Sequence, residues 1–189
     1  FYISDHPLNQ YKSIFRLYNI TSYQDFEINN DILSSNIACT VLKVQEKKTQ
    51  KGSSYGIVKF SDLSSTFELF IFSEIFELNR EHLVEGNSLM LTLIKNYSDE
   101  SKTQRRVNVK KIISLKELTT KTFKNITFKF KNIEDIQKLK NLHFKNAETE
   151  VKIILDKGDE IQTFHLKDKR KVNNLLLNEL NLTKNILVE

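Results

Sequence analysis

The chain has 189 residues, of which 39% are hydrophobic and 28% are charged, and its formal net charge at pH 7 is +5. A length of this order suits one or two domains that can each bury a core, and we expect a globular protein. No run approaches the ~20 consecutive apolar residues of a membrane helix, and no signal peptide is visible, so we expect a cytoplasmic protein with no membrane partner.

Cysteine and histidine usage further narrows the class of protein. Cys39 is the single cysteine, so a disulfide framework is excluded and a reducing compartment is expected. The four histidines are scattered, whereas a structural metal site needs clustered ligands, so no metal site is predicted in this chain. The basic balance indicates a polyanionic partner, although a solvated lysine-rich surface explains it equally well.

Residues 1–35 are predicted to form a helical lead-in. Pro7 suits the first turn of a helix, where its missing N–H costs nothing, and apolar residues then recur at helical spacing from Leu8 to Tyr18. A segment of this length cannot form a core of its own, so its apolar face is expected to pack against another domain. We therefore interpret 1–35 as a linker from a domain further upstream.

Residues 36–115 are predicted to form a five-stranded β-barrel. The expected strands are 37–44, 55–62, 66–72, 88–97 and 105–115, with a short helix that begins near Ser73. Three strands, a helix and two further strands in this order match the oligonucleotide-binding (OB) fold. Residues 116–189 are predicted to be a separate α+β domain, because an alternating strand, a helix, a hairpin at 150–166 and a leucine-rich helix follow one another. The fold class is therefore mainly β and α+β.

The two loops that bind ligands in OB folds are strongly basic here. Lysines dominate the first loop. The second loop contains Lys102, and two arginines begin the strand that follows it. Aromatic residues lie near these cations, so that phosphates could be neutralised and bases could stack. Lys59 and Phe70 share the outer face of their strands. The predicted nucleic-acid contacts are Lys47, Lys48, Lys51, Tyr55, Lys59, Phe70, Arg105 and Arg106. Phe72 precedes the helix and is expected to be packed. Ordinary solvated loops are the alternative reading of the cations.

No catalytic constellation is predicted. A Gly-rich phosphate loop, a Gly-x-Ser-x-Gly turn and a histidine beside a nucleophile are all missing from the sequence. The carboxylate pairs Asp99-Glu100 and Asp159-Glu160 fall in turns, and His6 is expected to cap a helix. In the last helix Leu175, Leu176 and Leu177 span more than one face, so these leucines are the candidates for a protein partner.

Two stretches resemble the catalytic alpha subunit of bacterial DNA polymerase III. FYISDHPLNQY (1–11) resembles a phrase of that family that reads Gly-Phe-Tyr, an aliphatic residue, Ser or Thr, any residue, then His-Pro-Leu before a helix. QEKKTQKGSSYGIVKFSDLSSTFELFIF (45–72) resembles the family's OB motif. Its marked positions are matched by Lys51, Gly52, Tyr55, Asp62, Ser64, Glu68, Ile71 and Phe72, whereas Gly56 stands where alanine is usual.

The resemblance implies a replicative DNA polymerase as the parent chain, a nucleotidyltransferase that uses a divalent metal such as Mg²⁺. It implies that this segment is the C-terminal piece, without the catalytic carboxylates, without a cofactor and inactive alone. The OB domain would guide single-stranded template DNA, and the last domain would attach to the clamp-loader tau subunit and other replisome proteins. Residues 116–189 match the family only in element order and position.

Two other interpretations remain open at the level of sequence. The OB domain could be a protein-docking module without direct DNA contact. An anticodon-binding OB domain of a tRNA synthetase is the third reading, and the His-Pro-Leu helix and the α+β tail have no place in it.

Overall fold

The computed structural model describes residues 6–97 and 105–187 of the chain. It divides into two compact units, Phe1–Lys116 (unit 1) and Glu117–Glu189 (unit 2). Helices within the described residues are all too short or too polar to cross a membrane. The class is mainly β and α+β, as predicted.

The lead-in of unit 1 is helical and packs on the unit's own sheet. It consists of the 3-10 helix η1 (Pro7–Tyr11), α1 (Lys12–Phe15), the short strand β1 (Ile20–Thr21) and α2 (Tyr23–Ile28). His6 caps η1, because its Nδ1 accepts a hydrogen bond from the backbone N–H of Leu8 at 3.2 Å. Tyr23 and Phe26 join the hydrophobic core, and the Tyr23 ring stacks on Phe67 at 3.8 Å.

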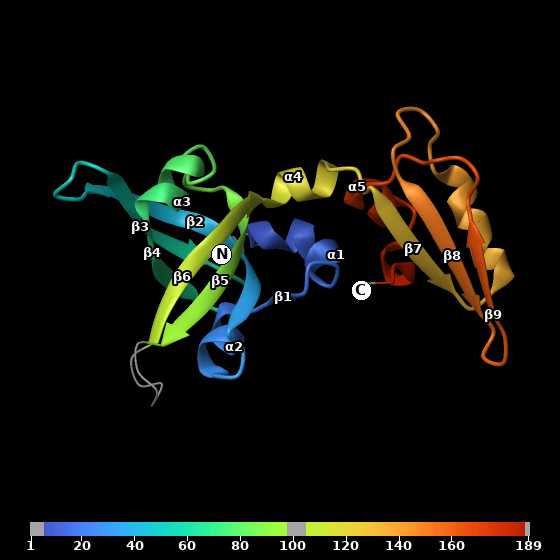
Figure 1. Cartoon of the computed structure of the whole chain (residues 1–189), viewed down its shortest axis with the longest axis horizontal. Coiled ribbons are helices and arrows are strands. Elements are labelled where there is room, and N and C mark those ends of the chain that lie inside the picture. Colours follow the sequence, from blue (N-terminus) through green and yellow to red (C-terminus); the bar gives the residue numbers. More distant parts are fainter. Residues whose placement is uncertain (1–5, 98–104, 188–189) are drawn as a thin grey trace, which may run out of the picture. The chain divides into compact units, whose positions relative to one another are not determined.

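One antiparallel sheet forms the body of unit 1 (Figure 1). It contains the strands β2 (Ser34–Lys48), β3 (Ser54–Ser61), β4 (Thr66–Ile71), β5 (Ser88–Tyr97) and β6 (Arg105–Ser114), and α3 (Ser73–Leu78) lies between β4 and β5 in the chain. Their order in space is β4-β3-β2-β5-β6, and β1 pairs with β2 in parallel. The predicted order of three strands, a helix and two strands is confirmed.

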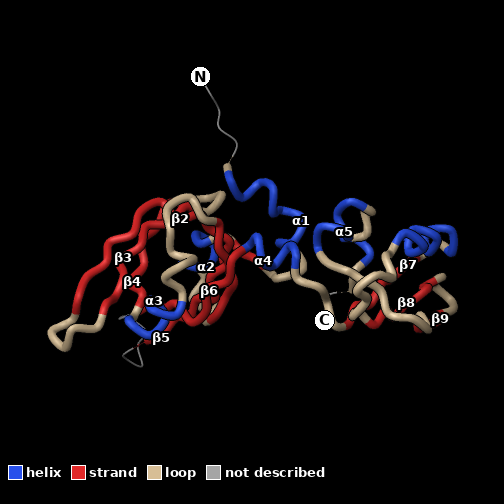
Figure 2. Tube along the Cα trace, turned by 90° about the horizontal axis from the view of Figure 1, so that it is seen from above, coloured by secondary structure: helices blue, strands red, loops and turns tan. Residues whose placement is uncertain are grey.

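The long strand β2 bends the sheet. Its first half pairs with β5 and its second half pairs with β3, with a bulge between Val41 and Lys43. Figure 2 shows the resulting curvature of the strands around the unit. Cα atoms of the edge strands β4 and β6 approach within 8 Å. Among the described residues no backbone ladder joins β4 to β6, so closure into a barrel stays a prediction.

Gly56 leaves space for the Phe76 ring in the hydrophobic core of unit 1. A Cβ atom at this position would lie 2.5 Å from Cδ2 of Phe76, which belongs to α3 and is buried. The ring therefore occupies the space that an alanine side chain would need. This packing is the physical reason for one departure from the motif that residues 45–72 resemble.

Unit 2 is a three-stranded sheet with helices. The last residues of α4 (Leu115–Thr120) lead into β7 (Asn125–Phe130), the 3-10 helix η2 (Ile133–Asn141), β8 (Glu150–Asp156), β9 (Ile161–His165), α5 (Asn174–Glu179) and the 3-10 turn η3 (Thr183–Asn185). The sheet order is β7-β8-β9, with β7 parallel and β9 antiparallel to β8. The predicted hairpin at 150–166 is confirmed.

Candidate nucleic-acid interface

The outer face of β2, β3 and β4 carries cations and aromatic rings together. Directly opposite residues of antiparallel strands share a face, and the register pairs Lys47 with Tyr55, Lys43 with Lys59, and Ile57 with Phe70. Val58, on the other face of β3, is buried in the core. Lys43, Lys47 and Lys59 therefore lie on the solvent side with the aromatic residues, and Glu68 lies on the same face opposite Lys59.

Three aromatic rings form one cluster on this face. The Phe70 ring lies 4.7 Å from Tyr55 and 5.0 Å from Phe72, the latter in an edge-on arrangement. Phe70 is 41% exposed and Phe72 is 53% exposed. The expectation that Phe72 is packed is wrong, because it continues the outward alternation of β4 past the last paired residue. We call Tyr55, Phe70 and Phe72 the aromatic platform.

The lysines of the β2–β3 hairpin do not all face the platform. Lys48 pairs with Ser54, one position along from the pair of Lys47 and Tyr55, so it points to the opposite face of the ribbon. Lys51 lies in the exposed turn between Lys48 and Ser54. Gly52 has φ +83°, a conformation that glycine adopts without strain, and the turn is closed by Thr49 and Ser53. Lys47 is thus the hairpin lysine that is best placed beside the rings.

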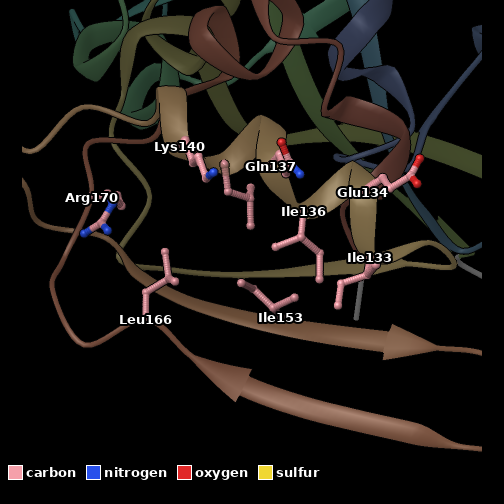
Figure 3. Close-up of a pocket in the computed structure, with 9 residues that line it drawn as sticks. Ile133, Glu134, Ile136, Gln137, Lys140, Ile153, Leu166 and Arg170 are labelled. Carbon is pink, nitrogen blue, oxygen red and sulfur yellow. The ribbon is translucent and has the colours of Figure 1, made fainter.

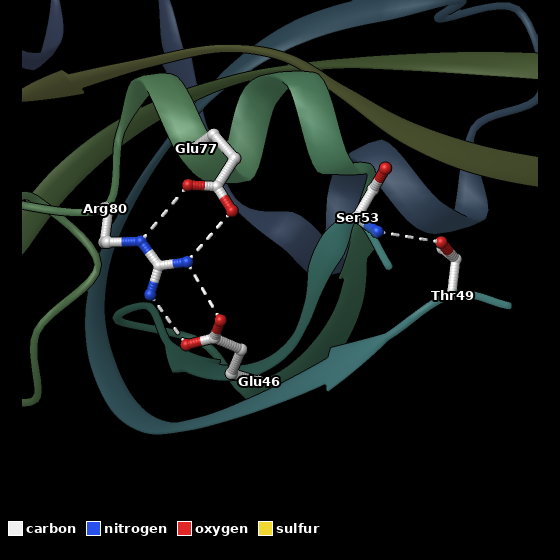
Figure 4. A network of polar contacts seen from close by, with 5 residues as sticks. All are labelled: Glu46, Thr49, Ser53, Glu77 and Arg80. Atoms are coloured by element: carbon white, nitrogen blue, oxygen red, sulfur yellow. Dashed lines mark hydrogen bonds and ion pairs between the residues drawn. The ribbon is translucent and has the colours of Figure 1, made fainter. Parts of the chain in front are cut away.

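A charge network ties the same hairpin to α3 (Figure 4). The Arg80 guanidinium donates to both carboxylate oxygens of Glu46, at 2.7 and 2.9 Å, and to Glu77 at 2.9 Å. Hydrogen bonds from Arg80 and from Ser54 lower the pKa of the Glu46 carboxyl to about 2. Glu46 lies on the same face as Lys48, away from the platform, and its charge is matched by Arg80.

The two arginines of β6 have different surroundings. Arg105 donates to the backbone carbonyl oxygen of Glu27 and to its Oε1 at 3.1 Å, so it holds the end of α2. Arg105 thus already has a carboxylate partner in the folded chain, and its contact with a phosphate stays a prediction. Arg106 is exposed and, one residue along the strand, points to the other face of β6. Lys102 and the pair Asp99-Glu100 lie outside the described residues.

A buried lysine supports the same end of α2. Lys95 is 3% exposed; its ammonium group donates to the carbonyl oxygens of Phe26 and Asn29, the latter at 2.6 Å, and lies 4.4 Å from the centre of the Phe26 ring. Burial lowers the pKa of Lys95. This cation was not singled out from the sequence, because its contacts are some 66–69 positions distant in the chain. Its role is structural.

The three candidate leucines of unit 2 have different environments. Leu177 is fully buried and packs in the core of its unit, which is a correction to the prediction that it meets a partner. Leu176 is half-buried, whereas Leu175 is exposed. The partner prediction therefore narrows to the surface around Leu175.

The described residues contain no group of three or more His, Cys, Asp or Glu side chains that could hold a metal ion. The Nε2 atom of His6 is hydrogen-bonded to the Ser61 hydroxyl at 3.2 Å, and its Nδ1 caps η1. Both ring nitrogens are therefore used in hydrogen bonds within unit 1. Cys39 is buried, and burial raises the pKa of its thiol well above the usual value.

Two features of the interface could not be found from residue types alone. Lys43 joins the face only once the pairing register is known, since the bulge after Val41 resets the alternation of β2. Phe72 lies one residue beyond the end of β4. A continued alternation from Glu68 through Phe70 to Phe72 was the available signal for the third ring.

Most of the chain is similar in sequence to known proteins. The matched relatives are DNA polymerase III alpha subunits. The match to the protein of Borreliella burgdorferi has 25% identity over 152 residues, and it covers 75% of this chain and 12% of that protein. For Rickettsia bellii the identity is 26% over 175 residues, which covers 91% and 14%, and for Rickettsia felis 33% over 101 residues, which covers 52% and 8%. No protein-family model matches the chain.

These relatives are far longer than the chain, which spans between 8% and 14% of their length. The chain is therefore similar to a short part of each of these alpha subunits. The longest match covers 91% of the chain and therefore includes residues of both units.

Proposed function

We propose that this chain is a segment of a DNA polymerase III alpha subunit and that unit 1 guides single-stranded template DNA. The observation that carries the proposal is the aromatic platform surrounded by Lys43, Lys47 and Lys59 on one exposed face. The similarity to three alpha subunits supports it independently.

The mechanism is stacking combined with phosphate neutralisation. Bases stack on the exposed rings of Phe70 and Phe72, and each such contact contributes about 1–3 kcal/mol without regard to sequence. The lysine ammonium groups neutralise backbone phosphates and release counterions, which makes binding dependent on salt. Base stacking does not depend on which base is stacked, so binding is sequence-tolerant.

Further roles belong to the same proposal. Unit 2 attaches the polymerase to the clamp-loader tau subunit and through it to other replisome proteins in the cytoplasm. The longer parent chain performs DNA-directed DNA synthesis with divalent metal such as Mg²⁺, and its catalytic carboxylates lie outside this segment. The chain alone is expected to extend no primer, and a primer-extension assay checks this.

A titration with fluorescein-labelled oligo-dT tests the DNA role. The variant K43E/K47E/K59E is compared with K124E/K131E/K145E, which makes the same change in net charge at exposed lysines of unit 2. We expect the first variant to bind several-fold more weakly and to reduce the salt slope by about 2, since each phosphate contact on a single strand contributes ~0.7.

The alternative proposal is a protein-docking module without DNA contact, for which an exposed aromatic cluster is equally suited. It predicts equal and weak oligo-dT binding by both variants at low salt. That result would remove the DNA role from unit 1 and leave the docking role.

A further inference from the structure

An apolar groove lies in unit 2, between η2 and the sheet. Its volume is about 480 Å³, and its walls are Ile133, Ile136 and Leu139 from η2, Ile153 from β8, and Leu166. Figure 3 shows the isoleucines of η2 directed toward Ile153 and Leu166 across the groove. Apolar side chains that face an open hollow lose contacts which a partner's side chain can restore.

The apolar surface continues from the groove to the edge of the sheet. Phe164 of β9 stands opposite Ile153 in the register, so both residues are on the face that η2 partly covers. Phe164 is 45% exposed, which shows that η2 leaves the β9 side of this face uncovered.

The strand β9 presents an unpaired backbone edge. It is the last strand of the order β7-β8-β9 among the described residues. The N–H of Leu166 donates to Val151 O at 3.0 Å, and in an antiparallel ladder such bonding alternates along the strand. The N–H and C=O groups of Ile161, Thr163 and His165 therefore point away from β8, where an added strand can pair with them.

The two ends of the groove carry opposite charges. Lys140 and Arg170 stand at the Leu166 end, and Glu134 stands at the opposite end (Figure 3). Arg170 lies over the Phe144 ring at 3.8 Å and donates to two backbone carbonyl oxygens. In the described part of unit 2 no carboxylate forms an ion pair with Lys140 or Arg170. A carboxylate from outside fits this end.

We propose that the groove binds an extended peptide segment of a protein partner, which pairs with the edge of β9, packs apolar side chains over Phe164 and the groove, and places carboxylates at the Lys140 and Arg170 end. The open edge favours a peptide over a small apolar ligand, because a small ligand has no use for the backbone groups of β9. This inference rests on the proposed function in one respect, since unit 2 must attach to a protein.

The test measures the fluorescence anisotropy of two synthetic peptides of about ten residues. Each has leucine at alternate positions and a block of aspartates, at the N-terminus in one and at the C-terminus in the other, so that both strand directions are covered. We expect one peptide to bind, and we expect a version with lysines in place of the aspartates not to bind. Charge reversal in K140E/R170E should weaken binding on the order of tenfold.

Matched variants separate the groove from the rest of the surface. Ile133 and Ile161 are both 66% exposed, but Ile161 lies on the other face of β9 from Phe164. Ile133→Asp should abolish binding, and Ile161→Asp should not. Thr163→Pro removes an edge N–H that β8 does not use, and proline is tolerated on edge strands, so it should abolish binding while Thr163→Ala preserves it.

Three results would overturn the inference. They are binding by neither acidic peptide, equal effects of Ile133→Asp and Ile161→Asp, and concentration-dependent self-association of the chain that Thr163→Pro abolishes, which would make a second copy the occupant. A parallel pull-down with the clamp-loader tau subunit keeps the two proposals distinct. Peptide binding without tau binding refutes only the proposed attachment to tau, and tau binding that survives every groove variant refutes only the groove.

Discussion

Replacing Asp62 by alanine should detach the lead-in of unit 1 from the β3–β4 turn. The Asp62 side chain is buried, and its Oδ2 accepts from the backbone N–H of Tyr23 at 2.6 Å. Its Oδ1 accepts from the N–H groups of Ser64 and Ser65 at 2.8 and 2.7 Å and from the Ser64 hydroxyl at 2.8 Å. One carboxylate thus fixes the start of α2 and the turn together.

The cost follows from these hydrogen bonds. A bond to a charged group contributes about 1.5–3 kcal/mol, and the N–H of Tyr23 is buried, so alanine leaves that donor without a partner. Water can replace the partner of the turn N–H groups, which are only partly buried, so they add about 1 kcal/mol each. We expect Asp62→Ala to lower the free energy of unfolding of unit 1 by about 3–5 kcal/mol.

The assay is hydrogen exchange of the whole chain measured by mass spectrometry, because peptides from β3 and β4 report unit 1 separately from unit 2. Protection of β3 and β4 amides should fall by about two to four orders of magnitude in Asp62→Ala. The control Ser64→Ala removes one part-exposed hydroxyl and should change little. Equal protection in the two variants would refute the reasoning, because the shared carboxylate would then contribute no more than a surface hydroxyl.

Three further predictions concern packing, pH and binding. Gly56→Ala should destabilise unit 1 by about 1–3 kcal/mol in thermal unfolding because its Cβ meets the Phe76 ring, and Phe76→Leu in the same chain should recover part of the loss. Burial lowers the pKa of Lys95 in the folded state, so the unfolded chain binds more protons below pH ~10.5. Stability should therefore rise as pH increases from the lowered pKa toward that value, and urea titrations of Lys95→Met should lack this rise. Phe70→Ala should weaken oligo-dT binding about tenfold, whereas alanine at the exposed Leu78 should leave the affinity unchanged.

The order of elements could be predicted because it depends on local patterns. Alternation along 55–72 separates a buried face with Val58 and Leu69 from an outer face with Lys59 and Phe70, since successive side chains of a strand point to opposite sides. Turn residues such as Gly52 and Gly158, both with positive φ, mark the hairpins for the same local reason.

The composition of the candidate site depended on contacts between distant parts of the chain. The bulge in β2 places Lys43 on the platform's face, and the register of β3 with β4 brings Tyr55 beside Phe70. The pairing of Arg105 with Glu27, 78 positions away, cannot be read from the sequence. Periodicity is a property of neighbouring residues and can be read along the chain. The partners in ion pairs and ring contacts are often far apart in the sequence. Only the tertiary structure decides which of them come together.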